Sequence, residues 1–116
     1  MIEAVNSPAL RATIDVGNYM ACGQEGHEGA AAAARYTGYV HIKDMKKIPD
    51  DSKPHGWSIK PCIIGQGDVD IPACIRSILD AGYEGYLALE YEGPEDEEIG
   101  VPESIKYMKG LVEEFG

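Results

Sequence analysis

The chain alternates strand-like runs with helix-like runs, and this order narrows its fold more than any other feature. Runs rich in β-branched, aromatic and aliphatic residues predict strands over residues 10–16, 39–43 and 85–91. Helices are expected over 28–36, 71–81 and 102–115. Asp70 is placed to cap the second helix, and Gly38 is expected to end the first. Because alternating elements pair as parallel strands through right-handed crossovers, the sequence predicts an α/β fold with a parallel βαβαβα unit.

Three strands and three helices make an incomplete parallel sheet. Such a sheet is normally covered on both faces or closed into a barrel. Residues 44–67 read as a long polar connection, and residues 92–100 read as an acidic loop. We therefore expect one part of an α/β domain, with open strand edges that favour self-association or pairing with another chain.

The charge excludes several classes of partner. The chain holds 20 acidic and 10 basic residues, a formal net charge of -10, which disfavours nucleic acid because phosphates need Lys and Arg. No apolar run is long enough for a membrane helix, so no membrane is expected. The first residues lack a basic region before an apolar stretch, and the three cysteines lack CxxC spacing. A cytoplasmic location is the expectation.

A polar residue stands near the carboxyl end of each predicted strand. These residues are Asp15, His41 and Glu90. Side chains alternate along a strand, so each of the three faces away from the aliphatic positions that pack on helices. Together they form an oxygen and nitrogen donor set that suits Mn²⁺, Co²⁺, Mg²⁺ or Zn²⁺. The alternative is that each is an ordinary solvated residue.

Four motifs resemble a known family. They are Ile-Asp-Val-Gly-Asn at 14–18, Tyr-Val-His-Ile-Lys-Asp at 39–44, Ile-Gly-Gln-Gly-Asp-Val-Asp at 64–70 and the run at 81–93. Their order and spacing resemble the C-terminal part of the sugar phosphate isomerase/epimerase family, which has a xylose isomerase-like TIM barrel. The resemblance implies that residues 1–116 form a single C-terminal fragment holding the last three strands of that barrel.

The resemblance also implies roles for individual residues. Asp15, His41 and Glu90 would be three ligands of a divalent metal, and Glu90 would also be a catalytic acid/base. The substrate would be a small-molecule sugar or sugar phosphate, with a proton moved between neighbouring carbons of a ketose or related hydroxy-carbonyl. Asn18 and Lys47 would contact substrate oxygens.

The chain departs from the family in lacking one expected Glu, which is both a metal ligand and the second acid/base group. An isolated copy is therefore expected to be weakly active or inactive, with the missing half-barrel supplied by a partner. One alternative is a non-catalytic fragment or a partner-binding half-barrel. The other is a metal-dependent phosphodiesterase of the endonuclease IV type, which the acidic charge and the missing histidines disfavour.

Overall fold

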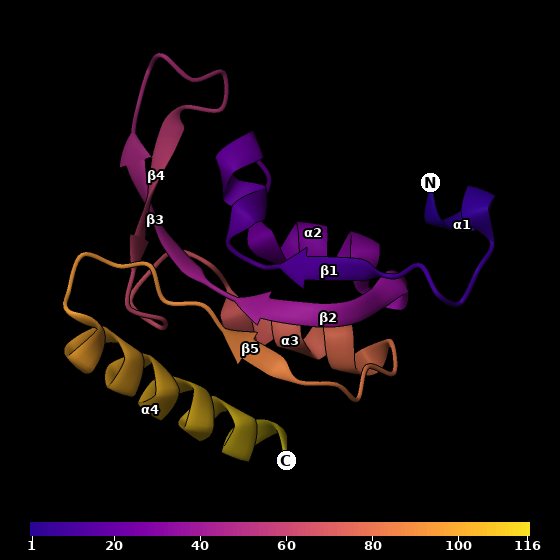
Figure 1. The fold of residues 1–116 in the computed structure, drawn as a ribbon. Helices are drawn as coiled ribbons and strands as arrows, with labels where there is room; N and C mark the ends of the chain where they lie inside the picture. The colour runs from indigo at the N-terminus through magenta and orange to yellow at the C-terminus, as the bar shows by residue number, and fades with distance from the viewer.

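Three parallel strands form an open sheet in the order β1 (Ala12–Asp15), β2 (Thr37–Ile42) and β5 (Leu87–Leu89). The protein is described by a computed structural model that covers residues 1–116 (Figure 1). The helical elements are α1 (Ile2–Val5), η1 (Asn18–Cys22), α2 (Gly26–Ala33), η2 (Ala34–Tyr36), α3 (Ile71–Asp80) and α4 (Glu97–Phe115). The predicted parallel α/β unit is confirmed, and its sheet does not close into a barrel.

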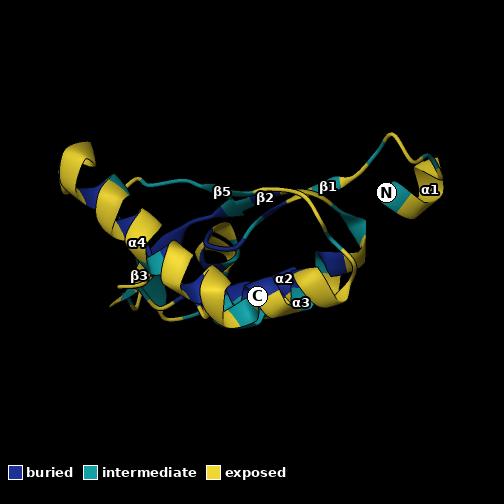
Figure 2. Ribbon diagram, turned by 90° about the horizontal axis from the view of Figure 1, so that it is seen from below, coloured by how far each residue is buried: buried dark blue, intermediate teal, exposed yellow.

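Helices α2 and α3 cover one face of this sheet (Figure 2). The aliphatic side chains of the strands, such as Ile14 and Val40, are buried beneath them. Helix α3 adds Ile75 and Ile78 to the same core, which holds 15 buried residues. Asp70 caps α3 by accepting a hydrogen bond from Ala73 N at 3.1 Å, as predicted. The opposite face of the sheet carries no helix in this chain.

The polar connection predicted over residues 44–67 contains a β-hairpin. Strand β3 (Asp44–Pro49) pairs antiparallel with β4 (Trp57–Cys62) and forms a second, two-stranded sheet. Two prolines and several charged residues in these strands hide the usual alternation, which is why the hairpin reads as a loop. In Figure 1 it extends from the edge at which the parallel strands end.

A buried carboxylate joins the hairpin to the loop that precedes α3. Asp44 is 1% exposed, and it accepts hydrogen bonds from the backbone amides of Met45, Gly65, Gly67 and Val69 at 2.9 to 3.2 Å. A Cβ atom at Gly67 would overlap Asp44 Oδ1, so this close approach requires glycine. Gly65 also donates its amide to Asp44, but it must be glycine because its φ is 96° and a Cβ atom there would overlap Tyr107.

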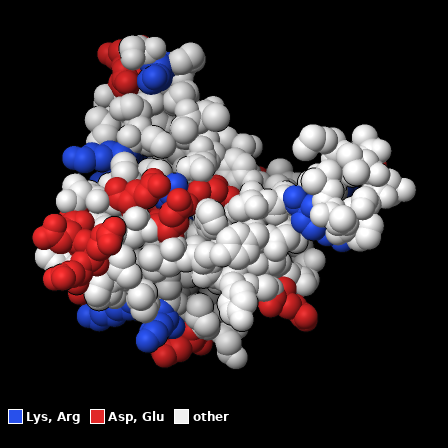
Figure 3. All heavy atoms as spheres, in the orientation of Figure 1, with Lys and Arg blue, Asp and Glu red and all other residues white.

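Two helix boundaries differ from the sequence prediction. Gly38 lies within β2, and the helix before it ends in the 3₁₀ turn η2. Helix α4 begins at Glu97 rather than at residue 102, so Pro102 lies inside the helix as its sixth residue and leaves one hydrogen bond of the first turns unmade. Acidic side chains gather around the start of α4, at the left of Figure 3.

The apolar side chains of α4 are only partly buried. Met108 and Leu111 are 8% and 6% exposed, whereas Ile105 and Val112 are 40% and 50% exposed. No helix of the chain is both long and apolar enough to span a membrane.

Candidate metal centre

Three polar side chains meet at the carboxyl ends of the parallel strands. Asp15 is the last residue of β1, His41 lies beside it in β2, and Glu90 is the residue directly after β5. The register pairs Asp15 with His41, and the Glu90 amide donates to Ile42 O at 2.9 Å. One donor atom from each of the three side chains lies within 4.8 Å of the others. The sheet thus brings together the residues that the strand alternation placed on one face.

Local hydrogen bonds fix the orientation of Asp15. Its Oδ1 accepts from Gly17 N at 3.1 Å and from Asn18 N at 3.2 Å, in a turn that follows β1. Its Oδ2 faces the cluster and lies 3.9 Å from His41 Nδ1. The same histidine nitrogen lies 3.1 Å from Glu90 Oε2. One oxygen of Asp15 is therefore used by the backbone, and the other is directed at its two neighbours.

Lys43 follows His41 by two residues, which places it on the same face by the alternation of extended chain, and its side chain reaches the same oxygens. Lys43 Nζ lies 3.6 Å from Asp15 Oδ2 and 3.2 Å from Glu90 Oε2. It also lies 3.2 Å from Glu92 Oε2, which belongs to the segment after β5. The Lys43 side chain is only 7% exposed, whereas the Glu92 side chain is 50% exposed. Lys43 and Glu92 were not among the predicted site residues.

The charges of this cluster stabilise one another. Burial by itself lowers the pKa of Lys43, but Glu92, Asp15 and Glu90 outweigh it and raise the pKa. Burial by itself raises the pKa of Glu90, but the Lys43 ammonium and the nearby His41 outweigh it, so that the pKa lies below its ordinary value. Glu90 is therefore ionised and Lys43 is charged at neutral pH.

The donor set fits a divalent cation. Glu90 Oε2 is buried and accepts no hydrogen bond of good geometry. Two carboxylates and one imidazole offer the mixed oxygen and nitrogen ligands that Mg²⁺, Mn²⁺, Co²⁺ and Zn²⁺ accept. Three protein ligands leave coordination positions for the oxygens of a substrate.

The two predicted substrate-binding residues differ in their surroundings. Asn18 begins η1 and its side chain is exposed, next to the turn that holds Asp15. Lys47 forms an ion pair with Glu25, and its ammonium lies 4.4 Å from the centre of the Trp57 ring. The nearest basic side chain to the three ligands is Lys43. Its spacing of two residues from His41 was the available sequence signal, but that spacing does not tell which carboxylates the long side chain contacts.

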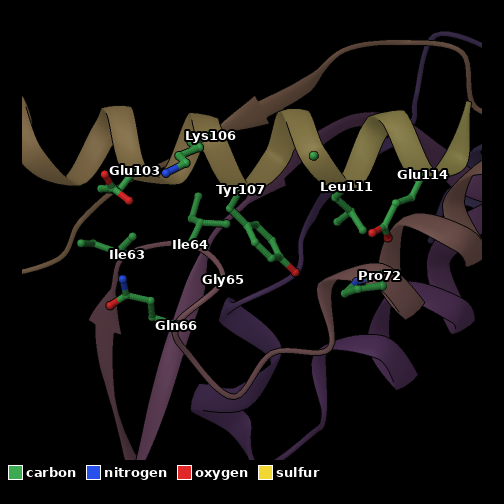
Figure 4. A pocket seen from close by; sticks show the side chains of 11 residues that line it. Ile63, Ile64, Gly65, Gln66, Pro72, Glu103, Lys106, Tyr107, Leu111 and Glu114 are labelled. Carbon is green, nitrogen blue, oxygen red and sulfur yellow. The ribbon is translucent and has the colours of Figure 1, made fainter.

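Two cavities beside helix α4 lie away from the three ligands. One of about 520 Å³ lies between the loop after β4 and helix α4, with Tyr107 pointing into it (Figure 4). Another of about 430 Å³ is an apolar groove between β5 and α4. Neither is lined by Asp15, His41 or Glu90, whose side chains are 13%, 35% and 34% exposed at the edge of the sheet.

A family model described as xylose isomerase-like TIM barrel matches residues 1–111. The chain belongs to this family. No curated protein sequence matches the chain closely enough to count as a relative.

Solved structures of the xylose isomerase-like family superpose on most of the chain. A xylose isomerase domain protein from Planctomyces limnophilus matches 95% of it with a TM-score of 0.78 and 29% identity, over 40% of its own length. A xylose isomerase-like TIM barrel protein from Mycobacterium smegmatis in complex with magnesium matches 95% of it with a TM-score of 0.74 and 23% identity, over 37% of its own length.

A third structure, an IOLI protein with a binding zinc atom, matches 96% of the chain with a TM-score of 0.63 and 20% identity, over 39% of its own length. The chain therefore spans about two fifths of these neighbours. Its open sheet corresponds to a part of their TIM barrels.

Proposed function

We propose that the chain carries three metal ligands and one proton-transfer carboxylate of a divalent-metal-dependent sugar isomerase or epimerase. The observation that carries the proposal is the convergence of Asp15, His41 and Glu90 at the carboxyl edge of the parallel sheet. This edge is where barrels of this architecture bind their substrates. The family match supports the sugar class, and the magnesium and zinc bound by two neighbours support the metal.

The residues have distinct roles in this proposal. Asp15, His41 and Glu90 would hold the ion, which when bound supplies Lewis-acid polarisation of a carbonyl and a hydroxyl oxygen. Glu90, kept ionised by the charges around it, accepts a proton from a substrate carbon beside the carbonyl and returns it to the neighbouring carbon. Asn18 and Lys47 are proposed to contact substrate oxygens.

We further propose that the active unit needs more strands and a second acid/base carboxylate. The parallel sheet is open at β1 and β5, and the groove beside β5 is lined by Leu87, Leu89 and Ile105. Unpaired strand edges and exposed apolar side chains favour packing against a further segment. That segment would be a second copy or a chain holding the remaining half-barrel.

Calorimetric titration of the purified chain with Mn²⁺ tests the metal site. We expect roughly stoichiometric binding that the substitution His41→Asn weakens by about tenfold or more, as loss of metal-site residues does. His55→Asn is the matched control, because His55 packs on Trp57 in the hairpin and lies outside the cluster. Absence of binding, or binding that His41→Asn leaves unchanged, would contradict the metal site and favour a non-catalytic module. Isomerase assays with a supplied N-terminal half-barrel then test the reaction.

A further inference from the structure

The position of Lys43 is the feature of the cluster that the proposed function leaves unexplained. Its ammonium contacts Asp15 Oδ2 and Glu90 Oε2, which are the same two oxygens that approach His41 Nδ1. A cation therefore already lies against the carboxylates that would hold a metal. Lys43 is buried and connects β2 to β3, so its ammonium stays near these oxygens and changes partner only among the neighbouring carboxylates.

Glu92 offers this ammonium a second partner. Its Oε2 lies 3.2 Å from Lys43 Nζ, as close as Glu90 Oε2, yet Glu92 has no contact with His41 or Asp15 among the ion pairs. Three carboxylates surround one ammonium, so the cluster carries two uncompensated negative charges when His41 is neutral. If Lys43 pairs with Glu92 alone, these two charges fall on Asp15 and Glu90 and match one divalent ion.

We propose that Lys43 is a built-in counter-ion of the metal site, which holds Asp15 and Glu90 together without metal and moves to Glu92 alone when a divalent ion binds. The inference rests on the proposed function, because it assigns a role at the same site. Two charges of the same sign cannot share these oxygens without a large electrostatic cost. The ammonium therefore competes with the ion, and Glu92 reduces that competition.

Mn²⁺ titrations of four chains test the competition. Removing the ammonium with Lys43→Met should tighten Mn²⁺ binding by about tenfold, since the ion no longer meets a positive charge at its ligands. Lys60→Met is the matched control, because Lys60 is exposed on β4 and forms no ion pair, and it should bind as the wild type does. Glu92→Gln removes the second carboxylate partner of the Lys43 ammonium, so this substitution should weaken Mn²⁺ binding.

A double variant separates this effect from the plain loss of a negative charge. In the Lys43→Met background, Glu92→Gln should change the affinity by less than about threefold, whereas in the wild-type background we expect about tenfold. Equal effects in the two backgrounds would overturn the transfer to Glu92. Circular dichroism of each variant without metal checks that it is folded. If Lys43→Met does not fold, Glu92→Gln compared with Glu95→Gln decides, and equal affinities for these two would overturn the inference.

The outcomes distinguish this inference from the proposed function. Tight binding by the wild type with no gain in Lys43→Met would overturn the role of Lys43 and leave the metal site standing. Binding by Lys43→Met alone would support the competition but contradict the stoichiometric binding that the proposed function expects of the wild type. Absence of binding by both chains would overturn the metal site itself, and the competition with it.

Discussion

Substitution of Asp44 offers the sharpest test of how the hairpin of β3 and β4 is attached to the loop that precedes α3. The carboxylate is buried, forms no ion pair, and is satisfied only by four backbone amides from Met45 and the loop over residues 63–69. Oδ1 accepts two of these hydrogen bonds and Oδ2 accepts the other two. Burial raises the pKa of Asp44, and the four donors oppose that shift.

Replacement of Asp44 by alanine removes every one of these acceptors. Each stranded amide costs about 1 kcal/mol if water reaches it and up to about 3 kcal/mol if it stays buried. Four such amides give a loss of at least about 4 kcal/mol, a large share of the roughly 5–15 kcal/mol that stabilises a typical domain. Asp44→Asn keeps one acceptor oxygen and presents an NH₂ group to two donors, so about half of that loss is expected.

Urea denaturation followed by circular dichroism measures both variants, with Asp51→Ala as the control because Asp51 is exposed in the hairpin turn. The expected order of stability is wild type and Asp51→Ala, then Asp44→Asn, then Asp44→Ala. A loss below about 1 kcal/mol in Asp44→Ala, or equal losses in the two Asp44 variants, would refute the assignment of a separate cost to each of the four amides.

Two glycine substitutions, acid denaturation and thiol modification test other parts of the same structure. Gly67→Ala should destabilise the chain by about 1–3 kcal/mol, because its Cβ would overlap the Asp44 carboxylate. Gly110→Ala should instead stabilise the chain by about 0.5–1 kcal/mol in the same urea assay, because Gly110 lies within α4 and a Cβ atom there would meet no other atom. In EDTA buffer, the lowered pKa of Glu90 contributes stability that is present above the unfolded value of 4.5 and is lost as the pH falls through the folded pKa. Glu90→Gln should therefore flatten this part of the acid denaturation curve, and an unchanged curve would contradict the ion pairs. A thiol reagent at about pH 8 should modify one cysteine in the native chain and three in urea, because burial raises the pKa of two thiols to about 11 and about 12; the exposed thiol is Cys22, and the buried ones are Cys62 and Cys74.

Much of the fold follows from local sequence patterns. The three parallel strands, the cap of α3 at Asp70 and the common face of Asp15, His41 and Glu90 depend on periods of about 2 and 3.6 residues, which neighbouring residues display directly. The hairpin over β3 and β4 shows no such period, because prolines and lysines interrupt its alternation, and the sequence prediction of a loop there was wrong. The residues at 50–56 between its strands are typical of a turn, and they were the available signal.

What the tertiary structure alone decided are the contacts between distant segments. Spacing placed Lys43 on the face of His41, but only the return of the chain after β5 brings Glu92 to the same ammonium. Likewise, the need for glycine at position 67 comes from Asp44, which stands far earlier in the chain. Periodicity is a property of adjacent residues, so a sequence displays it openly. The partner of a long charged side chain depends on where the backbone passes again in space, which only the packed structure shows.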